Sequence, residues 1–145
     1  MKSPLARIFV CEQTPHGAVL LRRFLPRMEI VEVRSVALLE DLLVQSPASF
    51  VVLVVTRENC HTMLAALATG VRKHAAAIWT VFTAAGLPAQ RADAFYTAGA
   101  QLLIPSYAEI PLLARLAQRQ FRRIAVPELS LAESIQQQLP WSPHS

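Results

Sequence analysis

The chain has 145 residues, of which 53% are hydrophobic and 17% charged, and its formal net charge is +4. This length and composition are typical of a single globular domain with a sizeable core and exclude a disordered chain. No apolar run approaches the roughly 20 residues that span a bilayer. Because Arg7 also interrupts the start before a signal-peptide core, we expect a cytoplasmic protein without a membrane segment.

The charge is unevenly distributed along the chain. All 14 basic residues lie within residues 1–125, whereas residues 126–145 hold only two charged side chains, Glu128 and Glu133. The body is therefore basic and the tail acidic, and a basic surface can attract an anionic partner. The two cysteines, Cys11 and Cys60, fit no CxxC or metal-binding spacing, so we expect buried, reduced thiols.

The sequence is organised around Phe50–Val55, six consecutive apolar residues followed by a polar segment that ends at Asn59. A short, mostly β-branched run without alternation predicts a strand covered on both faces, at the centre of a parallel sheet. Sites in such folds lie just beyond the carboxyl ends of the strands. Any site is therefore expected around Val54 to Asn59.

Strand-like and helix-like segments alternate along the chain. Strands are predicted at residues 7–11, 29–33, 50–55, 76–82 and 101–104, and helices at residues 14–25, 36–45, 60–70, 88–96 and 108–124. Five successive βα units predict a parallel sheet with right-handed crossovers, in a three-layer α/β/α sandwich.

The ends and faces of these helices follow from individual residues. Ser35 and Asn59 are predicted N-caps, because their side chains can accept a hydrogen bond from a free helical N–H. Val19, Leu20 and Phe24 are the predicted inner face of the first helix. Gly99 is the predicted C-terminal stop of the fourth.

The last helix, predicted over residues 108–124, has the strongest amphipathic pattern in the chain. Its outer face carries a stripe of cations, Arg115, Arg119, Arg122 and Arg123. This stripe has two interpretations, a solvated helix face or a surface that binds a protein partner. Nucleic-acid binding is disfavoured because no groove-reading helix or basic-aromatic interleaving accompanies it.

Residues 126–145 form a predicted tail behind the domain of residues 1–125, detached by Pro127. The tail contains a potential short amphipathic helix whose apolar residues are Leu131, Ile135, Leu139 and Trp141. A disordered tail does not need so many large apolar residues. They indicate packing, either back on the domain or on another subunit or protein.

Signatures of enzymes and cofactor sites are absent from the sequence. The four histidines are scattered, with no zinc-site spacing, so we expect no metal. The phosphate-binding patterns GxGxxG and GxxxxGK[ST] and the nucleophile motif GxSxG do not occur. We therefore expect neither enzymatic activity nor a cofactor.

Three short motifs, in order and at consistent spacing, carry a family resemblance. They are Ala6–Pro15 (ARIFVCEQTP), Ile78–Ala84 (IWTVFTA) and Ala98-Gly99-Ala100, the last followed by a short strand and Pro105. Over roughly residues 5–125 the chain resembles a response-regulator receiver domain. The resemblance implies a flavodoxin-like sheet of strand order 2-1-3-4-5 and a role in bacterial signalling.

In receiver domains an acidic pair and an aspartate at the end of the third strand hold Mg²⁺, and the aspartate accepts a phosphoryl group. The resemblance aligns the acidic pair with Glu12 and Gln13. It aligns the aspartate with Val54 or, if the register shifts by two, with Thr56. No carboxylate occurs from Phe50 to Arg57, and a threonine ester is not the labile acyl phosphate of such switches.

Two further family positions complete the comparison. The hydroxyl that senses the phosphoryl group is retained as Thr83, whereas the lysine position falls on Pro105 or Ser106, which carry no charge. Structural roles suit the retained residues: a solvated Glu12 at a strand end, near Arg57, and a Thr83 hydroxyl bonded to backbone.

The sequence thus favours a pseudo-receiver, a stand-alone interaction module that works without phosphorylation and can self-associate. Its expected partner-binding residues are Arg115, Arg119 and Arg122 of the last helix and Leu131, Ile135, Leu139 and Trp141 of the tail. The alternative is a small-ligand-binding or still phosphorylatable receiver, using an altered pocket formed by Glu12, Gln13, Val54, Thr56, Thr83 and Ser106.

Overall fold

A computed structural model of the chain describes residues 7–13, 16–83 and 89–128. Strands and helices alternate through these ranges. They are β1 (Ile8–Cys11), α1 (His16–Phe24), β2 (Ile30–Val33), α2 (Val36–Gln45), β3 (Phe50–Val55), α3 (Cys60–Lys73), β4 (Ile78–Thr83), α4 (Ala89–Ala98), β5 (Leu102–Ile104), a single 3₁₀ turn (Tyr107–Glu109) and α5 (Ile110–Glu128). None of these helices is both long enough and apolar enough to cross a bilayer.

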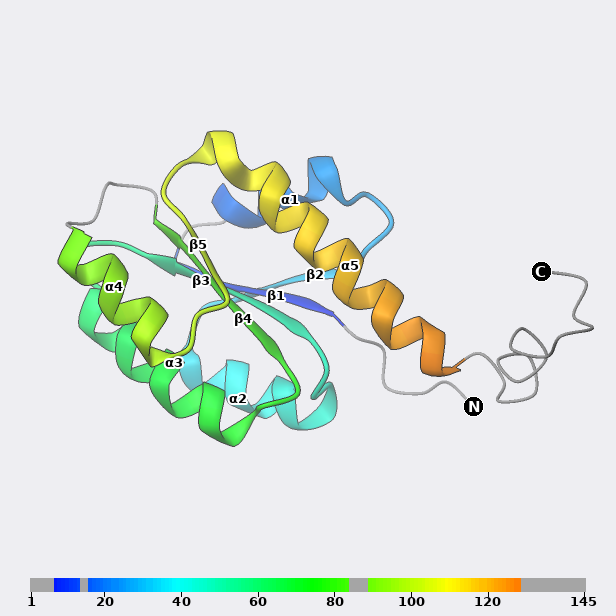
Figure 1. Cartoon of the computed structure of the whole chain (residues 1–145), viewed down its shortest axis with the longest axis horizontal. Coiled ribbons are helices and arrows are strands. Elements are labelled where there is room, and N and C mark those ends of the chain that lie inside the picture. The colour runs from blue at the N-terminus through cyan, green and yellow to red at the C-terminus, as the bar shows by residue number, and fades with distance from the viewer. Residues whose placement is uncertain (1–6, 14–15, 84–88, 129–145) are drawn as a thin grey trace, which may run out of the picture.

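The strands form one parallel sheet in the order β2-β1-β3-β4-β5 (Figure 1). Phe50 opens β3 between Ile8 of β1 and Ile78 of β4, so β3 lies at the centre of the sheet. All six residues of β3 are buried. The predicted flavodoxin-like order and the central position of Phe50–Val55 are confirmed.

Helices cover both faces of this sheet, because each strand alternates its side chains between the two faces. On one face α2, α3 and α4 pack over a core that includes Phe9, Leu39, Leu53, Leu67, Trp79 and Phe95 (Figure 1). On the other face α1 and α5 pack over a core that includes Ile8, Leu21, Phe50, Phe82, Ile104 and Leu113 (Figure 1). The three-layer sandwich is confirmed.

The predicted inner face of α1 is wrong at Val19 and Phe24 and right at Leu20, which is partly buried against the core. Val19 and Phe24 are each 45% exposed, whereas Ala18 and Leu21 are buried in the core. α1 has apolar residues on several sides, so its sequence offers more than one inner face. The orientation observed buries Ala18 and Leu21 and brings the N–H groups of residues 17 and 18 to the buried carboxylate of Glu12.

The two predicted N-caps behave differently. Ser35 accepts a hydrogen bond from the backbone N–H of Leu38, 3.2 Å away, and α2 begins and ends at the predicted residues. Asn59 occupies the N-cap position of α3 but makes no side-chain capping bond, because its amide bonds to the strand end before it. The helix continues past Gly70 to Lys73, three residues beyond the predicted end.

The last two helices end differently from one another. Gly99 follows α4 with φ of +120°, a conformation that glycine adopts readily, which confirms it as the stop of that helix. α5 does not end at residue 124 as predicted but runs through Pro127 to Glu128. A proline in the last turn removes one backbone donor, and here that loss does not end the helix.

Candidate functional site

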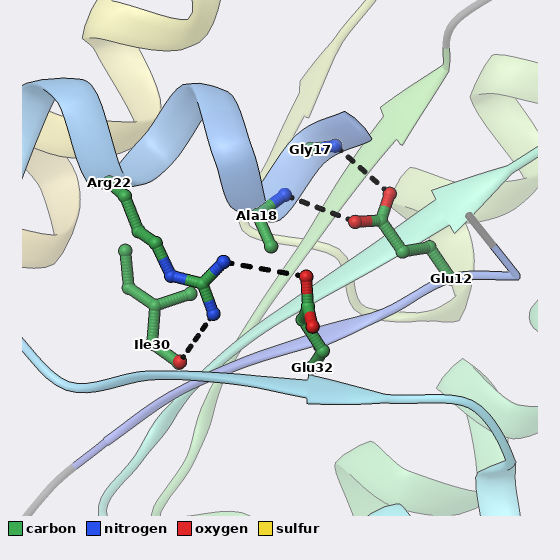
Figure 2. Close-up of polar contacts among 6 residues, drawn as sticks. All are labelled: Glu12, Gly17, Ala18, Arg22, Ile30 and Glu32. Carbon is green, nitrogen blue, oxygen red and sulfur yellow. Dashed lines mark hydrogen bonds and ion pairs between the residues drawn. The ribbon is translucent and has the colours of Figure 1, made fainter. Parts of the chain in front are cut away.

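The predicted site lies at the carboxyl edge of the sheet, where β1 and β3 end (Figure 1). Glu12 follows β1 directly and is only 5% exposed. Its two carboxylate oxygens each accept a backbone hydrogen bond of 3.0 Å, one from Gly17 and one from Ala18 (Figure 2). The carboxylate thus satisfies two of the free N–H groups at the start of α1 and meets the positive end of its dipole.

Gly17 allows this close approach of carboxylate, helix and strand. A Cβ atom at this position would lie 3.2 Å from Oε2 of Glu12 and 3.4 Å from Cγ2 of Val54. Val54 is 8% exposed and belongs to the core beneath α1 and α5. The structure therefore brings Glu12 and Val54 together around Gly17, with the carboxylate turned toward the helix.

A tight polar turn follows β3. The side-chain amide of Asn59 accepts a hydrogen bond of 2.7 Å from the N–H of Thr56 and donates one of 3.1 Å to the carbonyl of Val54. The Thr56 hydroxyl accepts a bond of 3.3 Å from the Asn59 N–H. Asn59 thus forms hydrogen bonds with both Thr56 and Val54. The sequence predicts Asn59 only as a helix cap and does not indicate this role.

The remaining predicted residues have separate surroundings. Thr83 is buried at the end of β4, and its hydroxyl donates to the carbonyl of Ile104 over 3.4 Å, as predicted. Ser106 opens the 3₁₀ turn, where its carbonyl accepts from the N–H of Glu109. Gln13 is exposed, and its carbonyl accepts a bond of 2.7 Å from Arg34.

Glu12 is not the solvated residue that we expected. It is buried, and its hydrogen bonds run to the backbone of α1 rather than to Arg57. The sequence holds a partial signal, because an acid shortly before the start of a helix is favoured by the positive end of its dipole. Whether its carboxylate turns toward that helix depends on how β1 and α1 pack together, which the sequence spacing alone does not specify.

Burial raises the pKa of Glu12 above its ordinary value of 4.5, while the bonds from Ala18 and Gly17 act in the opposite direction. A carboxyl with a raised pKa in the folded state binds its proton more tightly than in the unfolded chain. Its contribution to the free energy of unfolding is therefore largest at low pH, falls as the pH rises from about 4.5 through the folded pKa, and is constant above it.

This linkage gives a testable pH dependence. We expect the unfolding free energy of the native protein to fall relative to that of E12Q as the pH rises from about 4 to 7, because Glu12 loses its proton and glutamine does not titrate. Urea denaturation of both proteins at several pH values measures this difference. A difference that is constant with pH, or that moves in the opposite direction, would contradict the raised pKa.

Arg22 connects α1 to the edge strand β2. Its guanidinium donates to Glu32 over 3.4 Å and to the carbonyl of Ile30 over 3.2 Å (Figure 2). The helix that Glu12 holds at its first turn is thus tied to the sheet again near its last turn.

Both cysteines are buried and unpaired, as predicted. Burial, reinforced by the charge of Glu12, raises the pKa of the Cys11 thiol to about 11, so this thiol is protonated at neutral pH. Within the described ranges, no three His, Cys, Asp or Glu side chains gather closely enough to hold a metal ion.

A second feature lies on the outer side of α5, beside β5. Arg115, Arg119 and Arg122 are exposed there, as predicted; the side chain of Arg123 lies outside the described residues, as do Leu131, Ile135, Leu139 and Trp141 of the tail. The arginines border a groove of about 480 Å³ between the two elements. Its lining residues are Gln101, Leu102, Leu112, Arg115, Leu116, Gln118, Arg119 and Arg122.

The exposed edge of the sheet beside this groove is blocked by a tyrosine. The hydroxyl of Tyr96, on α4, accepts a hydrogen bond of 3.2 Å from the N–H of Leu103 and donates one of 3.4 Å to its carbonyl. Both backbone groups that Leu103 would offer to an added strand are therefore occupied, which protects the edge.

Comparison with known proteins gives a match among solved structures. No family model matches the sequence, and no curated protein matches it. Among solved structures, the chain is similar to the crystal structure of a CheY-like protein (tadZ) from Pseudomonas aeruginosa PAO1. That likeness establishes the fold. The TM-score is 0.66 at 22% identity, and the match covers 80% of this chain and 99% of the other.

Proposed function

We propose that this protein is a receiver-like signalling module that acts through protein contacts and without phosphorylation. The observation that carries the proposal is the state of Glu12, the one acid that the family comparison leaves in the pocket. Both of its oxygens accept backbone hydrogen bonds from α1. A carboxylate used as a helix cap does not present its oxygens to a ligand at the strand ends.

The residues at this edge do not fit the Mg²⁺ ion of the receiver family. Mg²⁺ takes oxygen ligands, normally one or two carboxylates together with phosphate. The second acidic position is Gln13, and the phosphoacceptor position is Val54, packed in the core, or Thr56, bonded to Asn59. With Glu12 occupied by α1, the aligned acidic-pair and phosphoacceptor positions that the structure describes offer neither a free carboxylate for Mg²⁺ nor a reactive aspartate.

The family positions that sense and neutralise a phosphoryl group also argue against phosphorylation. The hydroxyl of Thr83 is engaged with the carbonyl of Ile104. The lysine position is Pro105 or Ser106, and Ser106 serves the turn into α5. The hydroxyl at the sensing position is therefore engaged with backbone, and the lysine position carries no charge to neutralise a phosphoryl group. The alternative function, ligand binding or phosphorylation in the altered pocket, stays a prediction that the next experiment also addresses.

The phosphorylation-independent part of the proposal is tested with small phosphodonors. After incubation with acetyl phosphate and Mg²⁺, intact mass is expected to show no stable adduct, because neither β3 nor the two residues after it, Thr56 and Arg57, carry a carboxylate. Beryllofluoride with Mg²⁺ is expected to leave the melting temperature unchanged. A phospho-adduct that requires Mg²⁺, or a clear thermal stabilisation by beryllofluoride, would overturn this part.

The protein-contact part of the proposal rests on the α5 face. Its three arginines are exposed and form no ion pair within the part of the chain that the structure describes. In the native cell, partners captured by cross-linking are expected to be lost with R115Q/R119Q/R122Q. They should be retained with R23Q/R27Q/K73Q, which removes the same charge from exposed positions elsewhere.

The tail is tested in the same way. Because α5 continues to Glu128, the chain is shortened after that residue rather than after residue 125. If the tail contributes to binding, truncation weakens capture while the arginine face is intact. Capture that is equal for all variants would remove both surfaces from the proposal.

A further inference from the structure

We propose that the groove between β5 and α5 binds a small phosphorylated ligand with an apolar or planar part, such as a nucleotide. This goes beyond the proposed function, because the three arginines of the protein-contact face would also hold a small anion. Titration of the isolated chain measures that binding separately from the capture of protein partners. The site is distinct from the carboxyl edge of the sheet that the receiver resemblance singles out.

The groove is positively charged. Arg115, Arg119 and Arg122 all line the groove, and none of the described residues that line it is acidic. Within the described residues, none of the three forms a hydrogen bond or an ion pair. Like charges three and four residues apart on a helix repel one another, so a multiply charged anion that bridges them is stabilising.

The spacing of the three arginines along α5 suits a compact anion. Residues 115 and 122 are about 10 Å apart along the helix axis, so the guanidinium groups at these positions and at Arg119 can converge on one compact anion. Guanidinium forks donate two parallel hydrogen bonds to a phosphate, which makes arginine well suited to this class of ligand. The ligand should therefore carry two or more negative charges close together, as a diphosphate or triphosphate does.

The other residues that line the groove offer apolar and amide contacts. Leu102, Leu112 and Leu116 provide an apolar wall, and Leu112 is 44% exposed although it is a large hydrophobic residue. Gln101 and Gln118 add amide donors and acceptors. A volume of about 480 Å³ is within the usual range of small-molecule sites. Apolar contact beside directed amide bonds fits a planar base or a similar group.

The backbone edge of β5 favours a small ligand over a peptide strand. An extended peptide would gain affinity by adding to the edge of β5. The N–H and the carbonyl of Leu103 are both bonded to the Tyr96 hydroxyl. The groove therefore offers side-chain contacts rather than a backbone edge, which favours a compact ligand of the size of the groove.

The test is calorimetric titration of the full chain with ATP and, separately, with pyrophosphate, in Mg²⁺-free buffer at about 50 mM salt, where exposed charges are weakly screened. Both probes are expected to bind saturably. R115Q/R119Q/R122Q should weaken both by at least about tenfold, whereas R23Q/R27Q/K73Q, with the same change of charge, should stay within about twofold of the native protein.

A second variant tests the apolar wall. Leu112 is partly exposed, so L112S is expected to fold, to weaken ATP binding several-fold and to leave pyrophosphate binding unchanged. The proposal is overturned if neither probe binds saturably, or if the two triple variants weaken binding equally, which would indicate diffuse charge attraction. It is also overturned if polyglutamate binds through these arginines while ATP and pyrophosphate do not, because the ligand would then be an acidic polypeptide.

Discussion

Replacing Gly70 with alanine is expected to lower the free energy of unfolding by about 1–3 kcal/mol, the usual cost of overpacking a close contact. Gly70 is buried in α3 and faces the indole ring of Trp79 on β4. A Cβ atom there would overlap Cη2 of the ring and lie only 2.5 Å from Cζ2. The ring has little freedom to move, since it is 3% exposed and its Nε1 donates to the carbonyl of His74.

The sign of this effect makes the experiment decisive. In an open helical position the same exchange would stabilise the protein by up to about 1 kcal/mol, because alanine is the better helix former. A65G, at an exposed position of α3, measures that intrinsic preference by urea denaturation. G70A in a W79L background should recover most of its loss, in a double-mutant cycle. A stabilising G70A in the native background would contradict the contact.

Replacing Glu12 with alanine is expected to destabilise the protein by about 2–4 kcal/mol, because it leaves two buried N–H groups, of Gly17 and Ala18, without acceptors. The gain from no longer burying a charge offsets only part of this loss. E12Q retains one acceptor oxygen, so it should cost less than E12A. The measurement is urea denaturation at neutral pH, together with helix content by circular dichroism.

A matched control distinguishes this buried carboxylate from an exposed one. Glu32 is exposed and pairs with Arg22 over 3.4 Å, so E32A should cost less than about 1 kcal/mol. If E12A and E32A had equal effects, Glu12 would not be the buried cap of α1. The oxygens of Glu12 would then be free for a ligand, which would contradict the proposed phosphorylation-independent function.

The fold could be predicted from the sequence because its signals are local and mutually consistent. The uninterrupted β-branched run of Phe50–Val55 specifies a buried strand by itself. Ser35 before an apolar helix and Gly99 after another mark helix ends through their own side-chain or backbone chemistry. Five alternating units then leave few topologies that satisfy right-handed crossovers.

The candidate site was predictable in its place and residue types but not in its contacts. The sequence determined that Glu12, Val54 and Thr83 lie at the carboxyl edge of the sheet, because strand ends follow from strand positions. It did not determine that Glu12 turns inward, because the N–H groups that receive it belong to a helix whose phase is itself set by packing. The side chain of Asn59 could bond either the free N–H groups of α3 or the backbone at the end of β3. In the structure it bonds the backbone of Thr56 and Val54.

By itself, therefore, the sequence determined a five-unit α/β domain whose central strand has no carboxylate. Only the tertiary structure decided what the remaining polar groups do: Glu12 caps α1, Tyr96 closes the edge of β5, and Gly70 makes room for Trp79. The physical reason is the range of the interactions. Propensity and periodicity act between neighbours in sequence, whereas a buried polar group takes whichever partner the packed elements bring within hydrogen-bond distance.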